Sequence, residues 1–589
     1  MKRAACAAFA VALLALGARA DLVGHYTFGR VDPLEAVVGA AAQEGVMPSN
    51  VNQPVLSATT NTITLVDDAS VLGGRGAEVR GASEAELARL VEEDLSHTVR
   101  PGGVDGSPFW NGNARWFMYA PSFDFPETEG SAFYLFRVLG HDHVERTFRA
   151  DSPKASLLPV WGELPTCFTT VVCEARYHND GWWVSRSHHR SFWKMPPFRP
   201  GAYPAAPRPY GEAARMVCEY LLNLPAMRRL VETGRPDPGY WLNCYPAKMN
   251  AAVALLMARF AAREPSRRSD AERLARACLD YLMSVSQPAD APLAFFPPTY
   301  AGENYEAKTY AGLNVLVHPA EAGEAAVALY GVTHDGKYLD YAKKIAATYL
   351  RLQGEDGTWY FRVRESDGAC ASPNRLAPDA VVRFMDALFA ATGDAAYARC
   401  ADRAFAFFEN GPIKTWNWEG QFEDVAATPP YMNLTKHPAC AAAIRLVSRF
   451  PRDEGRRRVA RDILRFAEDQ FVCWERPFKA GGRSYAVDYF TRDFAVEPAV
   501  VEQYYYRTPV DASAAKLVLA YLALYKAEGS PLDLAKARAL GDSLVRMQRP
   551  DGRIPTLWWP DEAEKTQCDW LNCLVRSAVA LYALADAGE

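Results

Sequence analysis

The segment TWNWEGQFEDV, residues 415–425, carries two glutamates that could do acid–base chemistry. If the segment is an extended strand, Glu419 and Glu423 point the same way but stand about 13 Å apart, since a strand rises about 3.3 Å per residue. Carboxyl pairs that cleave glycosidic bonds lie about 5–9.5 Å apart. We therefore expect either glutamate to work with a carboxyl group from another segment. The alternative is that both acids are solvated and that Trp416 and Trp418 are core anchors.

Two histidines precede proline at the start of alanine-rich segments, in HPAEAGEAAVAL and HPACAAAIRLVSRF. His318 and His437 are therefore expected as helix caps, because proline suits the first helical position. Either imidazole could be a general base or bind a substrate hydroxyl, although capping alone is the plainer explanation. Glu321 lies in the first turn of an otherwise apolar helix, where burial is costly unless it faces a cavity. Asp379 opens another such helix, and capping is its default role.

Aromatic residues gather in the loops between the helical segments. Because aromatic rings are flat and apolar, a set of them on loops predicts a groove that stacks sugar rings; loop packing is the alternative for about half of them. The candidates for substrate binding are Tyr245, Trp241, Trp359, Trp416, Trp418, Tyr431, Trp558 and Trp559, together with the polar residues Arg362, Asn433 and Lys436.

From Tyr210 onward, twelve segments have helical periodicity. Amphipathic helices alternate with alanine-rich helices that are apolar all round, and a helix without a polar face is buried. This pattern predicts six hairpins in which outer helices surround an inner ring, with the long loops collected at one end. The predicted helices span residues 210–232, 246–263, 269–285, 319–331, 336–352, 378–391, 395–409, 438–449, 453–470, 511–527, 532–548 and 568–586.

Four of the inner helices begin with a residue followed by proline: Tyr245-Pro246, His318-Pro319, Ala377-Pro378 and His437-Pro438. If the hairpins close into a ring, these starts lie on one rim and face the central cavity. A helix N-terminus carries roughly half a positive charge. The rim should therefore favour a carboxylate or a sulfate, or keep a catalytic acid ionised.

The N-terminal part divides into segments by composition. Residues 1–20 have the pattern of a secretory signal peptide cleaved after Ala20, which predicts a secreted or periplasmic protein. Residues 21–106 are irregular apart from an amphipathic helix in ASEAELARLVEEDL. Residues 107–195 hold short alternating strands, typical of a small antiparallel sandwich, and residues 196–209 form a proline-rich linker.

Charge and motifs exclude several classes of function. The formal net charge is −5, and removal of Lys2, Arg3 and Arg19 with the signal peptide makes it −8, so a nucleic-acid partner is not expected. No apolar run after the signal peptide is long enough to span a membrane. No cysteine and histidine cluster has zinc spacing and no nucleotide-binding loop is present, so neither a metal nor a cofactor is predicted. The oligomeric state is not predicted.

Two resemblances extend these expectations. The order WGELP…TTVVCEARYHNDGWWVSRSHHRSFWK resembles half of a fibronectin type III domain, which implies an Ig-like β-sandwich that serves as a spacer or binding module. The repeated helical hairpins with aromatic loops over residues 210–589 resemble the six-hairpin glycosidase-like superfamily of (α/α)6 toroids. That superfamily also includes polysaccharide lyases and sugar epimerases. The expected fold is thus multidomain, a small N-terminal β-sandwich followed by an all-α (α/α)6 toroid.

The second resemblance implies a carbohydrate-active enzyme. The first expectation is a glycoside hydrolase acting on an oligo- or polysaccharide, with Glu419 or Glu423 as proton donor. The alternative is a lyase or epimerase acting on a uronic-acid polymer, in which His318, His437 or a rim tyrosine removes the proton beside the carboxylate and cations such as Arg362 neutralise it. A third possibility is a glycan-binding protein without catalysis.

Overall fold

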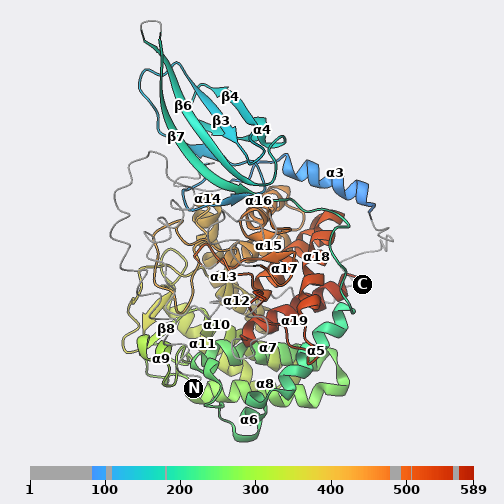
Figure 1. Ribbon diagram of the computed structural model, residues 1–589. Coiled ribbons are helices and arrows are strands. Elements are labelled where there is room, and N and C mark those ends of the chain that lie inside the picture. Colours follow the sequence, from blue (N-terminus) through green and yellow to red (C-terminus); the bar gives the residue numbers. More distant parts are fainter. Residues whose placement is uncertain are drawn as a thin grey trace, which may run out of the picture.

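The computed structural model describes residues 82–100, 109–179, 182–477, 493–505, 507–560 and 569–588. It consists of a β-sheet unit that stands on a ring of helices (Figure 1). The predicted signal peptide, and the part of the irregular N-terminal region up to residue 81, lie outside the described residues. The amphipathic helix predicted before the strands is confirmed as α3 (Glu84–Leu95), whose first turn is capped by the Ser83 hydroxyl.

The predicted ring of helical hairpins is present. Each inner helix packs on the next, and the last packs back on the first, so the ring closes. The inner helices are α7 (Pro246–Arg263), α10 (His318–Thr333), α12 (Asp379–Thr392), α15 (His437–Arg449), α17 (Asp511–Glu528) and α19 (Leu571–Asp586). The outer helices are α5 (Tyr210–Asn223), α8 (Arg268–Val285), α11 (Gly336–Leu352), α13 (Ala395–Asn410), α16 (Glu454–Phe471) and α18 (Pro531–Met547).

The inner helices owe their position to their composition. In α7, nearly every side chain is buried, as expected for a helix of alanine and larger apolar residues with no polar face. One predicted helix differs: residues 210–232 form α5 and then α6 (Pro225–Thr233), because Leu224 precedes a proline and adopts an extended conformation. None of the described helices is long and apolar enough to cross a membrane.

The connections from outer to inner helices are long and those from inner to outer helices are short. Since every hairpin is antiparallel and the ring is closed, the inner helices start at the same end of the barrel. The long connections contain η3 (Trp241–Cys244), α9 (Tyr305–Thr309), β8 (Leu313–Val315), β9 (Arg362–Arg364), α14 (Pro412–Thr415), β10 (Val472–Cys473) and β11 (Ala499–Val500). They position the candidate site at that end.

The residues before the ring form a five-stranded sheet in the order β1-β7-β6-β3-β4. Its strands are β1 (Trp116–Phe117), β3 (Phe133–Leu139), β4 (Glu145–Ala150), β6 (Phe168–Asn179) and β7 (Trp182–Lys194); β2 (Ser122–Asp124) pairs with β5 (Lys154–Ser156), and α4 (Leu158–Trp161) lies beside them. All neighbours are antiparallel except β1 and β7. The fibronectin-like sandwich stays a prediction.

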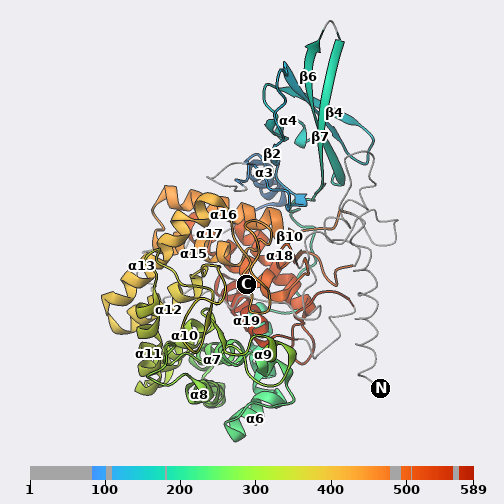
Figure 2. The same cartoon turned by 90° about the vertical axis from the view of Figure 1, so that its left-hand side faces the viewer.

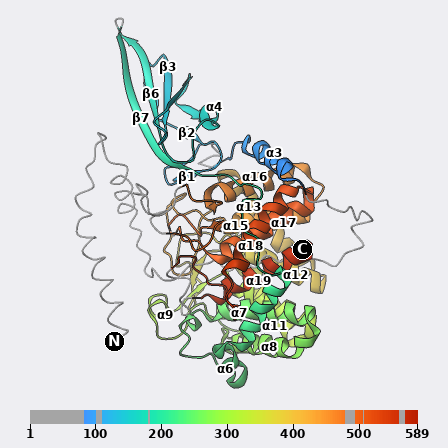
Figure 3. The ribbon, with the colours of Figure 1, turned by 45° about the vertical axis from the view of Figure 1, so that its right-hand side comes forward.

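The sheet is fixed to the ring through β1 and α16. Asp469 accepts hydrogen bonds from the backbone N–H groups of Met118 (2.6 Å) and Tyr119 (2.9 Å). The Trp116 indole donates to the Gln470 carbonyl at 2.7 Å. The β6–β7 hairpin extends away from the ring (Figures 2 and 3). The predicted linker, residues 196–209, is no free spacer, since Phe198 packs edge-on against Trp474 of the ring at 4.9 Å between centroids.

Candidate active site

Glu423 lies where the inner helices begin, and its side chain is only 1 % exposed. The ammonium group of Lys248, in the first turn of α7, forms an ion pair with its carboxylate. His318, the first residue of α10, places Nε2 at 3.9 Å from the same carboxylate. Residues from three distant parts of the chain therefore meet around Glu423.

The backbone beside Glu423 is held by a cation and two phenols. Arg362 donates to the Glu423 carbonyl at 2.6 Å, and the hydroxyl of Tyr300 donates to the same oxygen at 2.5 Å. Tyr310 donates to the Asp424 carbonyl at 3.1 Å. Arg362 lies in β9, which pairs with β8, and β8 ends shortly before α10 begins. This pairing places Arg362 near the start of α10. These contacts fix the orientation of consecutive carboxyl groups.

His318 is held as a neutral imidazole. Burial lowers its pKa to about 3, despite the attraction of Glu423. Its Nδ1 is 3.1 Å from the Glu321 carboxylate, which also lies 3.5 Å from the Arg576 guanidinium of α19. Its Nε2 has no hydrogen-bond partner among the described residues. A neutral imidazole with one nitrogen held and the other unengaged can accept or donate a proton.

Two further carboxyl groups at this end favour the protonated form. Burial raises the pKa of Asp424 well above its ordinary value, and the neighbouring Glu423 raises it further. Burial also raises the pKa of Glu502, although Lys436 opposes that shift. Glu423, by contrast, faces the Lys248 ammonium directly. When two neighbouring carboxyl groups lie in environments that push their pKa values apart, one can act as the catalytic acid and the other as the base or nucleophile.

Several buried polar atoms at this end of the barrel lack a hydrogen-bond partner within the described part of the chain. A buried polar atom without a partner costs about 1–3 kcal/mol, so a cluster of them marks a place for a polar ligand. The cluster consists of Nε2 of His318, both ring nitrogens of His437, both carboxylate oxygens of Glu502, and one carboxylate oxygen each of Asp424 and Asp511.

Residues 415–425 do not form an extended strand, the condition under which Glu419 and Glu423 would point the same way. α14 ends at Thr415, Trp416 adopts a left-handed conformation with φ 61°, and only Glu419 forms an isolated bridge, to Leu434. As a result, the two glutamates do not share a face. Glu419 is held by the Asn374 amide and by Gln421 at 3.3 Å, apart from the cluster around Glu423.

Most aromatic side chains predicted to stack on sugars are packed in the core instead. Trp359, Trp418 and Trp558 are at most 1 % exposed, and Trp416 is 4 % exposed. The indoles of Trp359 and Trp558 donate to backbone carbonyls. The alternative of core anchoring, considered for Trp416 and Trp418, fits their burial, and Trp359 and Trp558 are buried in the same way. A bulky apolar side chain is most stable when it is buried.

The remaining binding candidates are dispersed. The Asn433 amide donates a hydrogen bond to the Gln503 side chain at 2.7 Å. The Lys436 ammonium donates to the carbonyls of Val501 and Glu502 and to the Ser513 hydroxyl. Both side chains therefore stabilise loops. The Tyr431 hydroxyl donates to the Thr415 carbonyl, and Trp559 packs against Phe494. Tyr245 is nearest to the cluster: it is buried at the start of α7 and stacks on Trp570. For Trp241, the structure places only the backbone, in η3.

The predicted capping roles are mostly wrong. His318 and His437 are the first residues of their helices, after Val317 and Lys436, and neither side chain caps. Asp379 is likewise the first residue of α12 and pairs with Arg383 at 3.2 Å. Tyr245, which precedes the proline at the start of α7, does occupy the cap position, but without a side-chain hydrogen bond.

Sequence reasoning missed Lys248, Asp424, Glu502 and Arg576. Arg576 had a usable signal, because it is the one cation in an otherwise apolar inner helix and must face the lumen or an ion-pair partner. Lys248 shares its helix with Arg259 and Arg263, so its signal was weaker. Asp424 follows a residue that was identified, and Glu502 lies in a loop without a recognisable pattern. Within the described residues, no group of three or more histidine, cysteine, aspartate or glutamate side chains is arranged to hold a metal ion.

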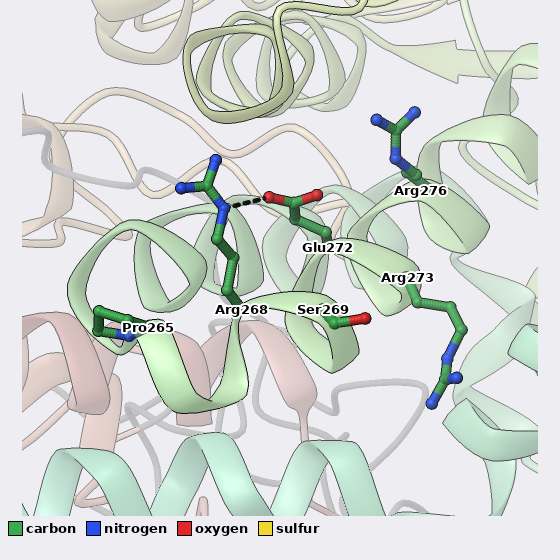
Figure 4. A pocket seen from close by; sticks show the side chains of 6 residues that line it. All are labelled: Pro265, Arg268, Ser269, Glu272, Arg273 and Arg276. Atoms are coloured by element: carbon green, nitrogen blue, oxygen red, sulfur yellow. Dashed lines mark hydrogen bonds and ion pairs between the residues drawn. The ribbon is translucent and has the colours of Figure 1, made fainter.

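A shallow surface depression on α8 offers no comparable chemistry (Figure 4). Arg268 pairs with Glu272 at 2.7 Å, Arg273 with Asp270 at 2.9 Å, and Arg276 with Asp335 at 2.7 Å. Exposed pairs of this kind contribute little and leave no group for a reaction.

Several solved structures align with the chain at low sequence identity. A family 76 glycoside hydrolase from a bovine Bacteroides thetaiotaomicron strain aligns over 80 % of this chain and 96 % of its own, with 11 % identity and a TM-score of 0.42. Cellobiose 2-epimerase from Spirochaeta thermophila aligns over 60 % and 89 %, with 14 % identity and a TM-score of 0.42. An unsaturated glucuronyl hydrolase specific for heparin aligns over 64 % and 97 %, with 10 % identity and a TM-score of 0.40. No family model and no curated protein matches the chain.

Proposed function

We propose that the protein is a carbohydrate-active enzyme, and that it hydrolyses glycosidic bonds in an oligo- or polysaccharide. The observation that carries this proposal is a contrast between two neighbouring carboxyl groups. Glu423 forms an ion pair with Lys248, whereas burial raises the pKa of Asp424. Asp424 would protonate the leaving oxygen, and Glu423 would activate water or attack the sugar. This proposal differs from the expectation in two ways: the proton donor is Asp424 and not Glu419 or Glu423, and both carboxyl groups come from one segment. Glu419 is left out because its partners are Asn374 and Gln421, outside the cluster.

The unpartnered polar atoms support a sugar as the ligand. Hydroxyl groups both donate and accept hydrogen bonds, so one sugar ring could satisfy His318, Glu502 and Asp424 together. Export of the protein stays a prediction that rests on residues 1–20.

A lyase or epimerase acting on a uronic-acid polymer is the second candidate. It is favoured by the neutral His318, whose Nε2 is unengaged among the described residues and could remove a proton beside a carboxylate. Lys248 and Arg576 would supply positive charge for the uronate and its developing anion.

The test is a panel of neutral and uronic polysaccharides, followed for reducing ends and for the absorbance of unsaturated uronate. Hydrolysis releases reducing ends without absorbance, whereas a lyase produces both. Glu423→Gln should lower turnover by a factor of about 10²–10⁴, the usual contribution of an acid or base, and Glu419→Gln is the matched control. Equal activities in the two variants would remove Glu423 from the mechanism, and binding without turnover would favour a glycan-binding protein.

A further inference from the structure

A cavity of about 1010 Å³ lies inside the ring, between α7, α10, α12 and α15. Its lining comes largely from the second halves of these helices, such as Leu255 of α7, Ala390 of α12 and Arg449 of α15. It therefore lies toward the C-terminal ends of the inner helices, whereas Glu423 lies where these helices begin. This volume is at the upper end of the range for small-molecule sites, about 300–1,000 Å³.

The walls of the cavity are mostly apolar. Leu255, Val327, Phe408 and Ile444 line it, with several alanines of α12 between them. Such a surface offers a sugar few hydrogen bonds, but it suits a hydrocarbon chain, because removing apolar surface from water is favourable.

Most charged groups in the lining neutralise one another. Arg383 lies 3.4 Å from Glu324 and 3.2 Å from Asp379, which places Asp379 in this ion-pair group and not beside Glu423. Arg445 pairs with Asp386 and with Asp402. Each of these two guanidinium groups therefore already has anionic partners.

Arg259 of α7 is the exception. Its half-buried side chain lines the cavity. Within the described residues, its guanidinium group forms no hydrogen bond and no ion pair. Burial lowers its pKa, and the attraction of Glu324 is offset by the repulsion of Arg383. A guanidinium in an apolar wall is best satisfied by an anion that its planar fork can bind through two hydrogen bonds.

We propose that this cavity binds a single-chain amphiphile with one carboxylate, a fatty acid or a molecule of that kind. The carboxylate would lie on Arg259 and the alkyl chain along the apolar walls of α10, α12 and α15. The site is separate from that of the proposed sugar chemistry, so neither proposal depends on the other.

The test is calorimetry of the full chain with octanoate, decanoate, laurate and dodecanol, each below its aggregation concentration. We expect one laurate per chain, with the dissociation constant falling about fourfold for each CH₂ added. Dodecanol, which has no charge for Arg259, should bind at least about tenfold more weakly. Absence of saturable laurate binding, or equal binding of laurate and dodecanol, would overturn the proposal.

Two variants locate the site. Arg259→Met keeps the apolar stem but removes the charge, so it should weaken laurate about tenfold or more and leave dodecanol unchanged. Ala387→Phe fills the cavity and should abolish binding of both ligands. Arg268→Met, on the outer surface (Figure 4), is the matched control and should bind as the parent does. Unchanged laurate binding in both cavity variants would contradict the assignment.

Discussion

Glu423 and Asp424 are consecutive in the chain, yet they meet opposite environments. The Glu423 carboxylate faces a buried ammonium group. Among the described residues, the Asp424 carboxyl forms no ion pair, and one of its oxygens has no hydrogen-bond partner. The backbone turn held by Tyr300, Tyr310 and Arg362 makes this difference possible, because it separates the directions of adjacent side chains. At the scale of single residues, the site is thus defined by environment and not by residue type.

The raised pKa of Asp424 predicts the pH dependence of the reaction. A proton donor is active only while it is protonated, so the rate should fall as pH rises through this pKa, which lies well above the ordinary value of 3.8. Asp424→Asn cannot donate an acidic proton, and its residual activity should lack that alkaline decline. The check is the pH profile of kcat/KM for both proteins. An identical alkaline limb in the variant would assign the decline to another group, such as Glu502.

At the scale of elements, α10 and α12 approach closely where they cross. A Cβ at Gly323 of α10 would overlap the ring of Phe384, whereas a Cβ at Gly331, in the same helix, would meet nothing within 4 Å. The absence of a side chain at Gly323 therefore sets the distance between two inner helices.

This pair of glycines gives a matched test of the ring. Gly323→Ala should lower the free energy of unfolding by about 1–3 kcal/mol, because the core must shift to accept a methyl group. Gly331→Ala should raise it by about 0.5–1 kcal/mol through helix propensity alone. Denaturant unfolding of both variants measures the difference. Equal changes would mean that α10 and α12 are not packed through Gly323.

The helices were predictable from the sequence, and the site only in part. Apolar periodicity is local, so the inner and outer helices could be located from about Tyr210 to the C-terminus. The ion pair of Lys248 and Glu423 joins residues 175 positions apart, and it depends on ring closure, which no local pattern encodes. The ion pair of Glu321 and Arg576 likewise joins distant residues and depends on ring closure. The aromatic residues of the loops were misinterpreted because an aromatic side chain that packs in the core and one that binds sugar can have the same local sequence.

At the scale of the whole molecule, the sheet and the ring share one buried contact centred on Asp469. Its carboxylate accepts two backbone N–H groups from the segment after β1, and burial raises its pKa to about 7. Lys536 lies in the same region and bridges Glu468 of α16 (2.7 Å) and Asp94 of α3 (3.1 Å). The two parts of the protein are thus joined by polar groups that are largely buried.

This contact should weaken as pH rises. Asp469 binds its proton more tightly in the folded state, where its pKa is about 7, than in the unfolded state, where it is near 3.8. Its contribution is therefore fully present below the unfolded value and is lost as pH rises through 7, with a slope of at most about 1.4 kcal/mol per pH unit. Asp469→Asn keeps the acceptor oxygen for both N–H groups but carries no charge to bury. Thermal unfolding between about pH 5 and pH 8 should show a steeper loss of stability for the parent than for the variant. Parallel curves would show that Asp469 is already ionised across that range, and that the two N–H groups compensate for its burial.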